Sequence, residues 1–152
     1  MGDVTLKMLE SGKACNPDKI YSGLMGPCIS IGIYDAKQKC GYMCHQPNPD
    51  WGAAMENFIR EILKKSDKKD LRVCACGGAH NLKGDDGDRK FMATTRKYVE
   101  DLLKKNFNAT QVTIFWAPLG SDTELILDTS NGQFQINKSH LSEDNRDEEE
   151  DF

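Results

Sequence analysis

A cysteine and a histidine seventeen residues apart, Cys28 and His45, are the residues of this chain whose types and spacing best suit catalysis. Cys28 stands where a Gly-Pro turn passes into an alternating apolar run, and His45 stands near the end of the next such run. Side chains on one face of two neighbouring strands come within reach of each other, as a cysteine nucleophile and its imidazole base must. The spacing therefore predicts a thiol–imidazole pair.

The backbone at Cys28 adds a second feature that suits acyl transfer. Pro27 has no N–H group, whereas the N–H of Cys28 stands at an edge position, at the start of a strand, where it is free to face a substrate carbonyl. Such a donor stabilises the oxyanion of a tetrahedral intermediate. A thiol beside an imidazole is partly ionised, so we expect iodoacetamide to label Cys28 before the other five cysteines near neutral pH.

Seven strands and two helices are expected around this pair. Alternation places three isoleucines on one face of the strand that begins at Cys28, and Cys28 itself on the other face. Residues 11–13 are expected to form a turn, and Asn131-Gly132 is a hairpin turn signal. The expected strands are 4–9, 28–34, 40–45, 71–76, 111–116, 123–128 and 133–136, and the expected helices are 52–65 and 89–106. This order predicts an α/β fold with a mixed sheet and helices packed against it.

The pattern around Cys28 and His45 resembles the chemoreceptor glutamine deamidase (CheD) family of bacteria and archaea. The chain reads Ser22-Gly-Leu-Met-Gly-Pro-Cys28, then an apolar strand that ends in Tyr34-Asp35, then Gly41-Tyr-Met-Cys-His45. The family pattern is approximately T-L-G-L-G-S-C, an apolar strand ending in Y-D, and G-x-M-A-H, with the same interval from cysteine to histidine. Gly77-Gly-Ala79 matches a G-G-A of the family, and the resemblance covers residues 1–138.

The resemblance implies a fold, an activity and a set of partners. The fold is CheD-like: two packed mixed β-sheets with helices on one side, in a domain of residues 1–138. The activity, in chemotaxis, is hydrolysis of a protein glutamine side chain to glutamate and ammonia through a cysteine thioester. Cys28 is the implied nucleophile, His45 the base, and Ser22, at the position of a family threonine, the hydroxyl that orients the imidazole. The chemistry requires no metal or organic cofactor. The implied partners are a protein with an exposed glutamine, a chemoreceptor or another protein, and a regulatory protein.

Two departures from the family leave a second function open. Ser22 keeps the hydroxyl of threonine but lacks the methyl group that restricts its rotamers. Residues 116–122 replace a loop that contains glycine and arginine in the family. The alternative to a deamidase is therefore an interaction module that keeps the fold without turnover.

The remaining cysteines allow a metal or redox module as a third hypothesis. Cys40 and Cys44 with His45, and Cys74 and Cys76 with His80, supply ligand types that zinc accepts. However, successive residues of a strand point to opposite faces, and the paired C-x2-C spacing of zinc knuckles is absent. The sequence favours free thiols that pack as small apolar side chains, with no metal bound.

Charge and hydropathy limit the partners and the compartment. Residues 143–152 carry a net charge of −6, against a formal net charge of −4 for the chain, so the rest carries +2. The rest of the chain has no basic tract that could bind the phosphate backbone, so nucleic acid is not expected as a partner. The absence of a signal peptide and of an apolar run of about 20 residues predicts a cytoplasmic protein without membrane insertion. Residues 139–152 are expected to form an acidic, disordered tail, and truncation after residue 136 or 137 is expected to leave stability and Cys28 reactivity unchanged.

Overall fold

Two β-sheets form the body of the protein. The computed structural model describes residues 2–49, 51–81 and 83–139. The four-stranded sheet has the order β1-β3-β8-β9, and the five-stranded sheet has the order β2-β5-β4-β6-β7. The strands are β1 (Val4–Thr5), β2 (Ser11–Cys15), β3 (Lys19–Tyr21), β4 (Ile29–Asp35), β5 (Cys40–Gln46), β6 (Leu71–Gly77), β7 (Val112–Trp116), β8 (Asp122–Asp128) and β9 (Gln133–Ser139).

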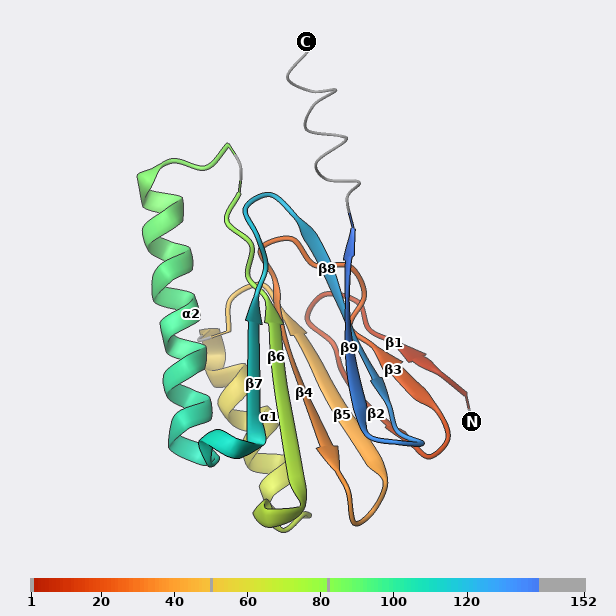
Figure 1. Cartoon of the computed structure of the whole chain (residues 1–152). Helices are drawn as coiled ribbons and strands as arrows, with labels where there is room; N and C mark the ends of the chain where they lie inside the picture. Colours follow the sequence, from red (N-terminus) through yellow and green to blue (C-terminus); the bar gives the residue numbers. More distant parts are fainter. Residues whose placement is uncertain (1, 50, 82, 140–152) are drawn as a thin grey trace.

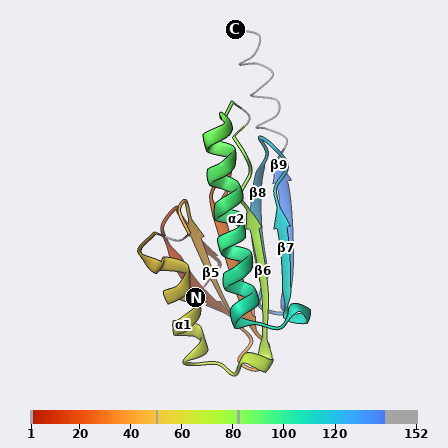
Figure 2. The same cartoon turned by 90° about the vertical axis from the view of Figure 1, so that its left-hand side faces the viewer.

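Each sheet mixes parallel and antiparallel pairs. β1 and β3 are parallel in the four-stranded sheet, as are β6 and β7 in the five-stranded sheet, and the other neighbours are antiparallel. Helices α1 (Ala54–Leu63) and α2 (Asp86–Asn106) lie on one face of the five-stranded sheet, whose other face packs on the four-stranded sheet (Figure 1). Figure 2 turns the helical layer toward the viewer. The expected α/β fold of two packed mixed sheets with helices on one side is confirmed.

The alternation of β4 separates two hydrophobic cores. Ile29, Ile31 and Ile33 pack under the helices, and each side chain is fully buried. Tyr34 and Cys28 belong to the core between the two sheets. The predicted division of the β4 side chains between two faces is therefore confirmed, and it places Cys28 on the inter-sheet side.

The structure corrects the predicted elements at the N-terminal end of the chain. The strand expected over 4–9 is limited to β1, and the residues expected to form a turn at 11–13 belong to β2. β2 pairs with β5 in a register that places Cys15 opposite Cys40, and a disulfide joins these two cysteines. The expectation of six free thiols was wrong, because the unpredicted strand brings Cys15 beside Cys40.

Two other elements differ at their ends. α2 begins three residues before the expected start, because the Asp85 side chain accepts a hydrogen bond from the Asp88 N–H and caps the helix. β9 continues to Ser139, beyond the expected end at residue 136, because its last residues pair with β8. The rest of the predicted acidic tail, residues 140–152, lies outside the described residues. Among the residues described, neither helix has the length and hydropathy to cross a membrane.

Candidate active site

Cys28 lies where the chain crosses from one sheet to the other, directly before β4, whose first residues are at the upper end of that strand in Figure 1. The crossing segment follows β3 of the four-stranded sheet and leads into β4 of the five-stranded sheet. Its first half is hydrogen-bonded to β8: the Ser22 N–H donates to the Leu125 carbonyl at 2.8 Å, and the Met25 N–H donates to the Thr123 carbonyl at 2.8 Å. The segment that carries Cys28 is therefore fixed to both sheets.

The strand register places His45 beside Cys28. His45 of β5 lies directly opposite Ser30 of β4, and Cys28 precedes Ser30 by two residues on the same face. Such diagonal neighbours have Cα atoms about 7–8 Å apart, with their Cβ atoms somewhat closer. Cys28 and His45 therefore share the inter-sheet face as predicted. The site lies at the end of a central strand rather than at a sheet edge, because β4 has β5 and β6 on its two sides.

A hydrogen bond from the backbone fixes the tautomer of His45. Its Nδ1 lies 2.7 Å from the carbonyl oxygen of Ser22. A carbonyl oxygen only accepts hydrogen bonds, so Nδ1 carries the proton and donates it. In the neutral imidazole Nε2 then holds a lone pair and can accept a proton. This is the tautomer that a general base requires.

Gly23 permits this contact between His45 and the crossing segment. Its φ of +78° lies in the left-handed region, and a Cβ there would lie 2.6 Å from the Leu6 carbonyl oxygen and 3.9 Å from His45 Nδ1. Any side chain at this position would collide with the Leu6 carbonyl and displace the segment that carries the Ser22 carbonyl. Glycine at position 23 therefore lets the Ser22 carbonyl reach His45.

The Ser22 hydroxyl has a different role from the one that the resemblance implies. Its Oγ donates to the Gly23 carbonyl at 2.7 Å and accepts the Leu125 N–H at 2.9 Å. Both hydrogen bonds secure the crossing segment, and neither reaches His45. The expectation that the hydroxyl orients the imidazole was wrong, because the main-chain carbonyl of the same residue does so.

We expect Ser22→Ala to reduce stability without disturbing the imidazole. The change removes two buried hydrogen bonds and leaves the Leu125 N–H without a partner, which lowers the free energy of unfolding by about 1–3 kcal/mol. The Ser22 carbonyl remains in place for His45. Urea denaturation will measure the loss of stability, and the NMR signals of the His45 ring will report the Nδ1 hydrogen bond. A lost Nδ1–H signal in a folded variant would contradict this assignment.

The thiol of Cys28 is not poised as a thiolate. Among the described residues it makes no hydrogen bond to His45, so the predicted thiol–imidazole contact is open in this structure. Its side chain is 9% exposed, and burial raises the pKa of the Cys28 thiol above its usual range. The expected ionisation near neutral pH therefore has no support in the surroundings of Cys28, although contacts in a catalytic pair commonly tighten only when substrate binds.

We expect iodoacetamide to label Cys28 before the other free thiols, because Cys28 is more exposed than they are. We expect this reaction to be slow at neutral pH. The other free thiols, Cys44, Cys74 and Cys76, are at most 1% exposed, and burial raises the pKa of each. Because only the thiolate reacts, the rate at Cys28 should rise with pH through a pKa above the usual range. Mass spectrometry after labelling from about pH 7 to about pH 10 shows which cysteine reacts first and how its rate depends on pH. A rate at neutral pH far above that of a free thiol would contradict this expectation.

The loop after β6 supports Cys28 from the other side. The Gly78 N–H donates to the Cys28 carbonyl at 2.9 Å, and the Ala79 N–H donates to the Gly26 carbonyl at 3.0 Å. These bonds hold the Gly-Pro-Cys turn and leave the Cys28 N–H without a partner among the described residues. The predicted free N–H donor is thus present at Cys28.

Arg96 of α2 secures this loop and was not identified from the sequence. Its guanidinium donates to the Gly78 carbonyl through Nε at 2.9 Å and through Nη2 at 2.6 Å, and to the Ala117 carbonyl at 3.1 Å. It also lies over the Trp116 ring, 5.5 Å from the centroid. Arg96 therefore joins the Gly-Gly-Ala loop to the start of the 116–122 loop. An arginine in an exposed helix carries no sequence signal that distinguishes this role.

A buried hydroxyl group lies beside His45. Ser30 Oγ is inaccessible to solvent and has no hydrogen-bond partner among the described residues. Ser30 lies directly between His45 and Cys76 across the strands. The alternation of the strand puts Ser30 on the same face as Cys28. Within the described residues, no three His, Cys, Asp or Glu side chains gather in a group that would hold a metal ion.

Comparisons with known proteins give the chain no family. No protein-family model matches it, and no curated protein does. Among solved structures, the chain is similar to the crystal structure of Bacillus licheniformis hypothetical protein YfiH, with a TM-score of 0.44 and 11% sequence identity. The match covers 72% of this chain and 50% of that chain, so this chain spans about half the length of the solved structure.

Proposed function

We propose that this protein is a cysteine-dependent amidohydrolase that converts a glutamine side chain of a protein to glutamate. The observation that carries the proposal is the hydrogen bond from His45 Nδ1 to the Ser22 carbonyl, because it leaves Nε2 available as a base on the face that Cys28 shares. The resemblance of the Ser22, Cys28 and His45 pattern to the chemoreceptor glutamine deamidases supplies the substrate class.

The reaction proceeds in two halves at one carbon atom. His45 Nε2 removes the Cys28 proton as Sγ attacks the carboxamide carbon, and the Cys28 N–H donates to the oxyanion. The imidazolium then protonates the amide nitrogen, so ammonia leaves and a thioester remains. His45 next takes a proton from water, and the hydroxide attacks the thioester. Glutamate is released, and Sγ recovers its proton.

The raised pKa of Cys28 decides when the proton moves. A buried thiol with a raised pKa keeps its proton at rest, so the thiolate forms only as the sulfur attacks. Substrate that excludes water from the site strengthens the hydrogen bond to the oxyanion at that moment. The proposed enzyme is therefore a general-base enzyme rather than one with a permanent thiolate–imidazolium pair.

A substrate-directed probe tests the proposal without knowledge of the natural partner. A chloroketone analogue of a glutamine-containing peptide should alkylate Cys28, and the analogue with the shorter asparagine side chain should react more slowly. Turnover is measured with denatured proteins as substrates. The assay follows ammonia release, and mass spectrometry finds glutamate at former glutamine sites. Ammonia release that is unchanged in Cys28→Ser would overturn the proposal.

An interaction module of the same fold is the second candidate. Two observations favour it. Among the described residues, the Cys28 thiol makes no hydrogen bond to His45, and burial raises the pKa of that thiol. A module without turnover should react with the glutamine chloroketone no faster than with a simple alkylating agent of equal reactivity. The ratio of the two rates at Cys28 therefore separates the two candidates.

A further inference from the structure

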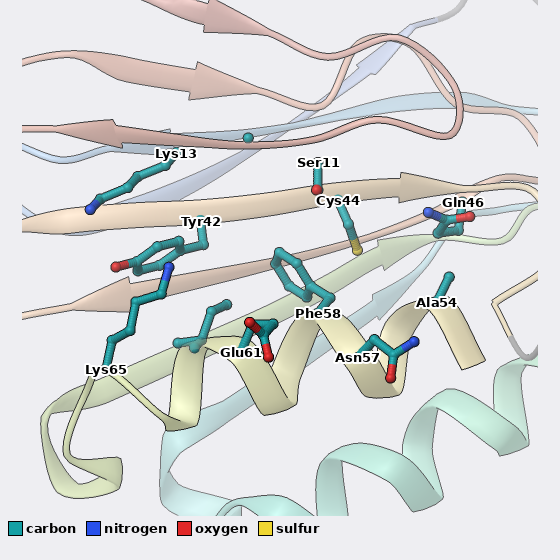
Figure 3. A pocket seen from close by; sticks show the side chains of 12 residues that line it. Ser11, Lys13, Tyr42, Cys44, Gln46, Ala54, Asn57, Phe58, Glu61 and Lys65 are labelled. Atoms are coloured by element: carbon teal, nitrogen blue, oxygen red, sulfur yellow. The ribbon is translucent and has the colours of Figure 1, made fainter. Parts of the chain in front are cut away.

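A groove opens on the helical side of the five-stranded sheet, away from the candidate active site. It lies between α1 and the strands β2 and β5, with a volume of about 480 Å³ (Figure 3). Tyr42 and Cys44 of β5 line it, whereas His45 of the same strand points to the inter-sheet face. A volume of this size falls within the range of small-molecule sites, about 300–1,000 Å³.

One end of the groove gathers two ammonium groups around a tyrosine. The Nζ atoms of Lys13 and Lys65 lie 5.5 Å and 5.8 Å from the centroid of the Tyr42 ring. Figure 3 shows the Tyr42 ring between these two side chains, one from β2 and the other from the end of α1. Glu61, the acidic residue that lines the groove, pairs with Lys64 at 2.7 Å rather than with Lys65. This end of the groove is therefore positively charged.

The hydroxyl of Tyr42 lies on the buried side of this end of the groove. Tyr42 is 5% exposed, and its oxygen is inaccessible to solvent with no hydrogen-bond partner among the described residues. A ligand in the groove therefore meets the two ammonium groups and not this oxygen. A group with negative charge is the one that the two lysines attract.

The strand pairing fixes this arrangement. Lys13 and Tyr42 are directly opposite in the β2–β5 ladder, and the next pair on the same face is the disulfide of Cys15 and Cys40. The covalent link and the ladder together hold Lys13 beside the Tyr42 ring. The floor of the groove farther along is apolar and includes Phe58 (Figure 3).

We propose that this groove binds a small aromatic anion. The anionic group binds the ammonium groups of Lys13 and Lys65 at the Tyr42 end of the groove, and the aromatic body rests on Phe58. Charge complementarity selects the anionic group, and the apolar floor selects the aromatic body. The site is independent of the proposed deamidase activity, because it uses the opposite face of β5.

Two fluorescent probes with nearly the same body test the proposal. Anilinonaphthalene sulfonate carries a negative charge, and phenylnaphthylamine lacks it. In the folded protein the anionic probe should bind at least about tenfold more tightly than the neutral one. Lys13→Met and Lys65→Met together should remove that preference and leave the affinity for the neutral probe unchanged. Tyr42→Phe should leave both affinities unchanged, because the Tyr42 oxygen is inaccessible to a ligand in the groove.

Two further variants separate this site from general attraction to a charged surface. Lys64→Met, the matched control, removes a neighbouring charge that does not line the groove and should leave both affinities unchanged. Asn57→Trp fills the groove from the exposed side of α1 and should weaken both probes. Equal losses in Lys64→Met and Lys65→Met, or binding that survives Asn57→Trp, would overturn the proposal.

Discussion

Replacing His45 with asparagine is expected to reduce glutamine hydrolysis by about 10²–10⁴-fold while the protein stays folded. The asparagine amide nitrogen can occupy the place of Nδ1 and still donate to the Ser22 carbonyl, which now lies 2.7 Å from the ring. The variant has no counterpart of Nε2, so it lacks the base that takes the Cys28 proton. The loss should appear in kcat, because His45 acts on the reacting thiol and on water.

Ammonia release and thermal unfolding, measured on the same preparations, check this expectation. Cys28→Ser should abolish turnover to a similar extent, and the double variant should lose little more, because the two residues act as a unit. Cys76→Ala is the matched control, since it changes a buried cysteine on the neighbouring strand that takes no part in the reaction. Full activity in His45→Asn would exclude His45 as the base.

Gly77→Ala is expected to have the largest effect on stability and to displace the nucleophile. Gly77 has a φ of +102°, and a Cβ there would lie under 3.0 Å from the Cys28 carbonyl oxygen. The left-handed backbone and the clash together should lower the free energy of unfolding by about 3 kcal/mol. Relief of the clash would move Cys28 away from the loop, so alkylation of its thiol should change as well.

Gly52→Ala supplies the control for backbone strain alone. Gly52 has a φ of +65°, and a Cβ there would meet no atom within 4 Å. This variant should lose only about 1–2 kcal/mol. Urea denaturation of both variants measures the difference. Equal losses of unfolding free energy in the two variants would show that the close contact between Gly77 and the Cys28 carbonyl adds no cost to that of the backbone strain.

The strands that hold Cys28 and His45 were predictable because their alternation is strong. β4 carries buried isoleucines at every second position, and β5 pairs with it along seven residues. A slip of one residue would turn all of these side chains to the wrong face, so the pattern fixes the register. The shared face of Cys28 and His45 follows from that register.

β2 and β3 were not predicted from the sequence. Ser11–Cys15 begins with serine and glycine, and Lys19–Tyr21 is only three residues long. Both become strands because β5 and β8 offer them edges with which to pair. Long-range pairing of this kind overrides local propensity, and it also explains why the disulfide of Cys15 and Cys40 was missed.

The role of Ser22 shows a second limit of sequence patterns. The spacing identified the residue that contacts His45, but the contact is made by its main-chain oxygen. Every residue type has that oxygen, so no sequence pattern distinguishes it from the hydroxyl. The same holds for the carbonyls of Gly78 and Ala117, which Arg96 binds.

The recessed position of Cys28 restricts what its sulfur can attack. Only 9% of the residue is exposed, and its side chain belongs to the core between the two sheets, so little of Cys28 is open to an approaching group. A polypeptide backbone in extended form carries bulky substituents on both sides of each peptide bond and cannot descend to such an atom. The tip of a long, unbranched side chain can. A hydrolase built on this cysteine would therefore alter the charge of intact proteins and leave their chains uncut.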